Sequence, residues 1–157
     1  MTVAVIGVGN RDRGDDGAGP AVADRVRARV GGAAEVLAGL LDPGELIDAW
    51  SGVDAAVVVD ALAPRGSPGT LRRFDAIAAP LPADLFATST HGLGVVHAIE
   101  LARALGMLPR TLVVLGIEAL GFEAGAPPSA EVARAVELAA DAVLEEIRAA
   151  SPAGVAG

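Results

Sequence analysis

The sequence predicts an α/β protein: a three-layer α/β/α sandwich with a mostly parallel, five-stranded sheet. Short apolar, often β-branched runs alternate along the chain with segments whose apolar residues recur at helical spacing. Parallel strands need crossover connections, and helical crossovers cover both faces of the sheet. With 157 residues, 52% of them hydrophobic, the chain can bury one sizeable core. We therefore expect one domain over residues 1–150 and a frayed tail over 151–157.

Five segments have the character of strands. Residues 2–6, 55–59 and 111–117 are nearly continuous apolar runs, which is typical of strands buried on both faces. Residues 34–38 form a second, shorter run between two helical segments. Residues 70–74 follow the turn 66–69 and alternate in polarity, which predicts an antiparallel edge strand.

The helical segments carry start signals. They cover about residues 20–30, 43–50, 92–105 and 129–150. Asp42 is an N-cap followed by Pro43 and by Glu45 at the capping-box position, and Ser129 caps the last helix. The stretch 76–88 is interrupted by prolines and predicts a loop with one helical turn. This order of elements fits a flavodoxin-like winding, in which ligands collect beyond the first and third strands.

The composition excludes several function classes. The chain has no cysteine, so a disulfide framework, a thiolate nucleophile and a Cys-ligated zinc are ruled out. All twelve basic residues are arginines, which excludes a Schiff-base or P-loop lysine. The net charge of -8 opposes nucleic-acid binding. No charge-free apolar run reaches the roughly 18 residues of a membrane helix, and no signal segment is evident, so we expect a cytoplasmic protein without membrane association.

Acidic and imidazole side chains follow the predicted strands or begin a helix. Asp15 and Asp16 come after the first strand, Asp60 comes after the third, and His91 precedes a helix. Two carboxylates and one imidazole leave room for water and substrate ligands on a divalent ion, which suits an open metal site. The alternative for Asp15 and Asp16 is that one of them only caps the first helix.

The motifs that carry these residues resemble hydrogenase maturation endopeptidases of the [NiFe] type. They are Gly7-Val-Gly-Asn10, Gly14-Asp15-Asp16-Gly17-Ala-Gly19, Val59-Asp60-Ala61 and His91-Gly-Leu-Gly94. The resemblance implies that Asp16, Asp60 and His91 are the metal ligands and the catalytic machinery. It also implies that Gly7, Gly9 and Asn10 shape the first loop.

The same resemblance implies the reaction and the partner. A C-terminal peptide would be removed from the hydrogenase large-subunit precursor after nickel insertion. The nickel would thus be supplied by the substrate, although another divalent metal can occupy the site in isolation. Transient binding to a large precursor is compatible with a monomer.

Three other readings compete with the protease. A dinucleotide site is disfavoured because the spacing of Gly7, Gly9 and Gly14 misses the fingerprint and the loop is acidic. A receiver-like, magnesium-binding phosphoacceptor would also have acids after the first and third strands, but it needs a lysine after the last strand, where this chain has Glu118. A noncatalytic binding protein with the same fold is the third alternative, and the presence of all three ligand positions argues against it.

Overall fold

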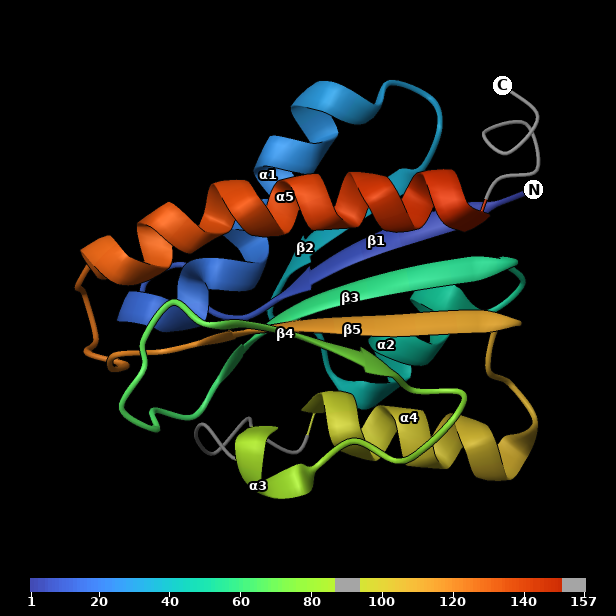
Figure 1. Ribbon diagram of the computed structural model, residues 1–157. Coiled ribbons are helices and arrows are strands. Elements are labelled where there is room, and N and C mark those ends of the chain that lie inside the picture. Colours follow the sequence, from blue (N-terminus) through green and yellow to red (C-terminus); the bar gives the residue numbers. More distant parts are fainter. Residues whose placement is uncertain (87–93, 151–157) are drawn as a thin grey trace.

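The computed structural model describes residues 1–86 and 94–150 (Figure 1). Within these residues the strands are β1 (Val3–Val8), β2 (Glu35–Gly39), β3 (Ala55–Leu62), β4 (Leu71–Asp75) and β5 (Thr111–Glu118). The helices are a short 3₁₀ helix, η1 (Gly14–Gly17), followed by α1 (Ala18–Val30), α2 (Pro43–Trp50), α3 (Ala83–Phe86), α4 (Gly94–Leu105) and α5 (Ala130–Ala150). The tail 151–157, which we expected to be frayed, lies outside the described residues.

The five strands form one mixed sheet in the order β2-β1-β3-β5-β4. The pairs β1–β2, β1–β3 and β3–β5 are parallel, and β4 pairs with β5 in the antiparallel sense. β2 thus lies on one side of β1, and the later strands lie on its other side, as expected for a flavodoxin-like winding. The predicted fold class is confirmed, including the antiparallel strand at the edge.

Helices cover both faces of the sheet (Figure 1). Val57 and Val59 of β3 belong to a buried cluster with residues of α1 and α5. Ala56 and Val58, which alternate with them, belong to a second cluster with residues of α2, α3 and α4. Because both faces of the strand are buried, its first five residues, 55–59, form an unbroken apolar run.

Two strands extend further than the sequence suggested. The first continues through Gly7 to Val8, because its pairing with β3 reaches Gly7 and its pairing with β2 reaches Val8. The third continues to Leu62, since it pairs with β5 in register over its whole length. Asp60 therefore lies inside β3 and not directly after it. The predicted helical turn in 76–88 is α3.

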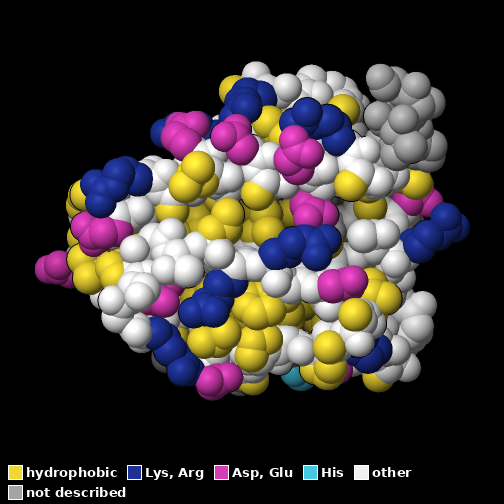
Figure 2. Space-filling view, in the orientation of Figure 1, with side chains coloured by type: hydrophobic (Ala, Val, Ile, Leu, Met, Phe, Trp, Pro, Cys, Tyr) yellow, Lys and Arg dark blue, Asp and Glu magenta, His cyan; other side chains and the backbone are white. Residues whose placement is uncertain are grey.

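Charged side chains are mixed on the surface that Figure 2 shows. Arginines of α1 pair with acids of α5, as in Arg29–Asp141 at 2.9 Å, and Arg73 of β4 pairs with Glu146 of α5 at 2.5 Å. Three of these four side chains are exposed, and exposed pairs contribute little stability individually. Within residues 1–86 and 94–150, no helix combines the length and the apolar character needed to cross a membrane.

Candidate metal-binding site at the carboxyl edge of the sheet

The carboxyl ends of β1, β3 and β5 lie together at one edge of the sheet, at the left of Figure 1, because these strands are parallel and adjacent. The short helix η1 follows β1 and contacts β3. Asp16 lies on η1 and Asp60 lies near the end of β3. The winding of the sheet thus brings to one edge two carboxylates that are distant along the chain.

Asp16 is nearly buried, with 6% of its surface exposed. Its Oδ2 accepts a hydrogen bond of 3.0 Å from the backbone N–H of Asn10. The Nη1 atom of Arg13 lies 3.8 Å from the same oxygen. No hydrogen bond from the described residues reaches Oδ1. One oxygen is therefore held by a backbone N–H, and no donor of residues 1–86 and 94–150 reaches the other.

Asp60 is partly buried in β3. Its Oδ1 accepts a 2.8 Å hydrogen bond from the backbone N–H of Ala61, and no donor among the described residues reaches Oδ2. Burial raises the pKa of Asp60 well above its ordinary value, and the nearby charge of Asp16 raises this pKa further. The Ala61 hydrogen bond lowers the pKa but does not offset these effects.

The two carboxylates therefore fit a divalent cation. They are close enough for the charge of Asp16 to disfavour ionisation of Asp60. Each carboxylate has one oxygen bound to a backbone N–H and a second oxygen without a described donor. A cation bound by the second oxygens would relieve the repulsion, and carboxylate oxygens suit hard or borderline divalent ions.

His91, the third predicted ligand, lies outside the described residues, as do its neighbours in 87–93. Within 1–86 and 94–150 the structure contains no group of three His, Asp or Glu side chains able to hold a metal ion. The structure thus brings Asp16 and Asp60 together. The placement of His91 remains a prediction from the sequence, in which it precedes α4 by three residues.

Asp15 has a different role from its neighbour Asp16. It is 1% exposed, and its carboxylate accepts hydrogen bonds from the backbone N–H groups of Leu120, Gly121 and Ser129 at 2.7, 3.3 and 2.6 Å. The Ser129 hydroxyl donates a fourth, at 3.0 Å. Both oxygens are used, so Asp15 is a structural residue.

The alternative role of Asp15 or Asp16, capping of the first helix, is not seen at α1. Gly17 occupies the N-cap position of α1, and no side chain caps it. Asp15 instead accepts a hydrogen bond from the backbone N–H of Ser129, the residue before α5. The Ser129 hydroxyl in turn accepts from the backbone N–H of Val132 at 3.4 Å. The reason is tertiary: the segment after β5 passes beside η1 and presents the backbone N–H groups of Leu120, Gly121 and Ser129 to the Asp15 carboxylate.

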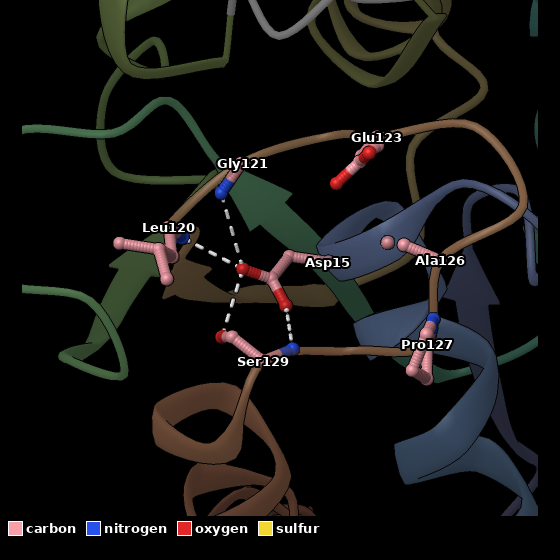
Figure 3. A pocket seen from close by; sticks show the side chains of 8 residues that line it. Asp15, Leu120, Gly121, Glu123, Ala126, Pro127 and Ser129 are labelled. Carbon is pink, nitrogen blue, oxygen red and sulfur yellow. Dashed lines mark hydrogen bonds between the residues drawn. The ribbon is translucent and has the colours of Figure 1, made fainter.

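Figure 3 shows the pocket beside Asp15, which has a volume of about 300 Å³. Its wall consists of Gly14, Asp15 and residues of the loop that connects β5 to α5, including Glu123 and Pro127. The Asp15 carboxylate points toward this loop and holds it in place through the hydrogen bonds drawn. The pocket lies next to η1, which carries Asp16, and sequence patterns gave no indication of it.

Glu118 is a second buried acid that stabilises a loop at this edge. It ends β5, is 2% exposed, and its Oε2 accepts hydrogen bonds from the backbone N–H groups of Arg65 and Ser67 at 3.1 and 2.5 Å. The β3–β4 loop is thereby fixed to the end of β5. This role was not predicted from the sequence, although an acid at the end of an apolar strand could have indicated it, since a buried carboxylate needs donors.

Gly9 and Asn10 both contact Asp16. A Cβ atom on Gly9 would lie 1.9 Å from the backbone oxygen of Asp16, and the φ angle of +140° is strained for other residues. Asn10 donates its N–H to Asp16, and its Oδ1 accepts from the N–H of Asp12 at 2.9 Å. On Gly7, a Cβ would lie 2.2 Å from the backbone oxygen of Gly19, so α1 can pass over β1 only at a glycine.

Gly9→Ala is expected to destabilise the fold by about 3 kcal/mol, because strain and steric overlap add. Gly39→Ala is the matched control, since Gly39 has a φ of +128° but nothing within 4 Å of its Cβ position. Gly39→Ala therefore introduces backbone strain without steric overlap and should lower the free energy of unfolding by only about 1–2 kcal/mol. Urea unfolding measures both. Equal losses in the two variants would show that the contact with Asp16 is unimportant.

The fold and the two neighbouring carboxylates define an α/β protein with a candidate cation site at the carboxyl edge of its sheet. The sequence model of the hydrogenase maturation protease family, HycI, matches residues 22–146. This match spans most of the chain, and the chain belongs to that family. The matched segment includes Asp60 and His91, whereas Asp16 precedes it.

Solved structures agree with this assignment. The hydrogenase maturating endopeptidase HybD from E. coli has the same fold, with 24% identity over 96% of this chain and 94% of that chain, and a TM-score of 0.81. The hydrogenase 2 maturation peptidase from a Thaumarchaeota archaeon is 27% identical over 94% and 98% of the two chains, with a TM-score of 0.69. The [NiFe] hydrogenase maturation protease HycI from Thermococcus kodakarensis is 25% identical over 94% and 92%, with a TM-score of 0.70. No curated protein sequence matches the chain.

Proposed function

We propose that this protein acts in the cytoplasm as the endopeptidase that removes a C-terminal peptide from the nickel-loaded large-subunit precursor of a [NiFe] hydrogenase. Its family and the solved maturation proteases with the same fold support the reaction class. The observation that carries the proposal is the convergence of Asp16 and Asp60, each with an oxygen that no described residue binds.

In this proposal the nickel belongs to the substrate. Asp16 and Asp60 bind the nickel of the loaded precursor, and His91 completes the ligand set. Nickel accepts oxygen and imidazole ligands, so the three side chains match its preferences. Binding to the nickel places the tail of the precursor at the carboxyl edge of the sheet. Because Asp16 and Asp60 come from one chain, a monomer is sufficient for this function.

The test is to mix the purified protein with its cognate precursor, with and without nickel, and to measure the mass of the large subunit. We expect loss of a C-terminal peptide only from the nickel-loaded precursor. A nickel-loaded cognate precursor that keeps its full mass would contradict the proposal. Equal cleavage of the nickel-free precursor would contradict recognition of the metal.

A phosphodonor experiment separates the protease from the receiver-like alternative. The protein is incubated with acetyl phosphate and Mg²⁺, and its mass is measured. We expect no phosphoryl group on Asp60, because the chain belongs to the protease family and has no lysine to bind the phosphoryl oxygens. A mass increase of one phosphoryl group on Asp60 would favour the receiver instead.

A further inference from the structure

Arg13 lies between the candidate ligand Asp16 and an aromatic ring. Its Nη1 is 3.8 Å from Oδ2 of Asp16, and its guanidinium carbon is 5.3 Å from the centre of the Phe122 ring. The Arg13 side chain is 28% exposed, whereas that of Arg11 in the same loop is 49% exposed and pairs with Asp24. Arg13 is therefore the arginine of this loop that turns toward the site.

The contact with Phe122 fixes the guanidinium more firmly than the contact with Asp16. A separation of 3.8 Å is too long for a hydrogen bond, although the two charges still attract each other. The guanidinium lies over the ring face at a distance typical of a cation–π contact. Phe122 follows Leu120 and Gly121, whose N–H groups are bound to Asp15. The ring thus belongs to a loop that is itself fixed.

One nitrogen of Arg13 has no hydrogen-bond acceptor among residues 1–86 and 94–150. Nη1 is buried and makes no hydrogen bond within the described residues. A buried N–H without an acceptor is costly. The nearest described charge is Oδ2 of Asp16, so a small rotation of that carboxylate would supply the missing acceptor.

We infer that Arg13 is a positioning residue for Asp16, an inference that rests on the proposed function of the site. Held against Phe122, Arg13 attracts Oδ2 and so directs Oδ1 of Asp16 toward the metal. Its positive charge also repels an incoming cation. This repulsion is weakened by solvent, because the side chain is partly exposed and the metal would bind the other oxygen. The alignment therefore outweighs the repulsion.

The test measures Ni²⁺ binding to the isolated protein by titration calorimetry, together with cleavage of the nickel-loaded precursor. Arg13→Ala is expected to weaken Ni²⁺ binding about tenfold, the size typical for losing a residue that orients a metal ligand. Arg13→Lys, which keeps the charge but not the planar contact, should fall between Arg13→Ala and the wild type. In the cleavage assay, Arg13→Ala should raise KM more than it lowers kcat, because binding of the nickel is affected.

Phe122→Leu provides an independent variant that leaves Arg13 in place. It should weaken Ni²⁺ binding about two- to fivefold, the value of one cation–π contact. Combined with Arg13→Ala, it should cause no further loss, because the ring acts through the arginine. Arg11→Ala is the matched control and should bind Ni²⁺ as the wild type does. Thermal unfolding verifies that each variant is folded.

Three results would overturn the inference. Tighter Ni²⁺ binding by Arg13→Ala would show that the arginine only repels the cation, and unchanged binding would show that it does not position Asp16. Additive losses in Arg13→Ala and Phe122→Leu would show that the two residues act separately. A wild-type protein that binds no Ni²⁺ would remove the premise. By contrast, a wild type that binds Ni²⁺ but does not cleave the precursor would refute the protease function and leave the role of Arg13 intact.

Discussion

Asp16→Asn and Asp60→Asn are each expected to slow cleavage of the nickel-loaded precursor at least about 100-fold. Each variant loses a metal ligand. Removing a ligand lowers the activity at least as much as removing a residue that only orients a ligand. The amide keeps the shape of the side chain and can still accept the hydrogen bond from the backbone of Asn10 or Ala61. Mass spectrometry of the precursor over time gives the rates.

The control for these variants is Asp12→Asn, which removes an exposed acid from the same loop as Asp16. It should cleave at the wild-type rate. Neither ligand variant should be less stable than the wild type, because a neutral amide removes the repulsion between the two carboxylates. Wild-type cleavage by both Asp16→Asn and Asp60→Asn would show that these carboxylates do not bind the nickel.

Asp15→Ala is expected to lower the free energy of unfolding by about 3–5 kcal/mol, a large fraction of the stability of a small domain. The substitution leaves three backbone N–H groups and one hydroxyl without their acceptor. The adjacent pocket admits water, so the loss is smaller than four complete penalties. Urea denaturation monitored by circular dichroism measures the change.

Ser129→Ala is the matched control, since it removes only the hydroxyl that bonds to Asp15 and caps α5. Its cost should be about 1 kcal/mol. If Asp15→Ala lost no more than Ser129→Ala, the carboxylate would not be the anchor of the loop after β5. Opposite effects of Asp15→Ala and Asp16→Asn on stability would separate the structural acid from the candidate ligand.

Much of the fold could be predicted from the sequence, because the local patterns of apolar and polar residues agree with the burial of those residues in the structure. The interior strands are apolar on both faces, as their sequences predicted. The capping box at Asp42 is also formed: the Asp42 side chain accepts from the backbone N–H of Glu45, and the Glu45 side chain accepts from the backbone N–H of Asp42. The edge strand β4 was recognised by its alternation and its preceding turn. The predicted ends of the strands were less accurate. Both β1 and β3 continue beyond their predicted ends, because each stays paired with a neighbouring strand there.

The candidate site was only partly visible in the sequence. Asp16 and Asp60 were singled out from their positions after apolar runs and from the family resemblance, and the structure places them at one edge of the sheet. Arg13 gave no signal, because its place depends on Phe122, more than a hundred residues away. The pocket beside Asp15 was hidden for the same reason.

The sequence by itself determined which segments become strands and helices, the absence of cysteine and lysine chemistry, and the acids available at the strand ends. These depend on side-chain periodicity and composition, which are local properties. Only the tertiary structure decided that both oxygens of Asp15 anchor a loop, while one oxygen of Asp16, near Asp60, has no donor among the described residues. Two adjacent and chemically identical side chains differ here because their directions, and so their donors, are set by segments far away along the chain.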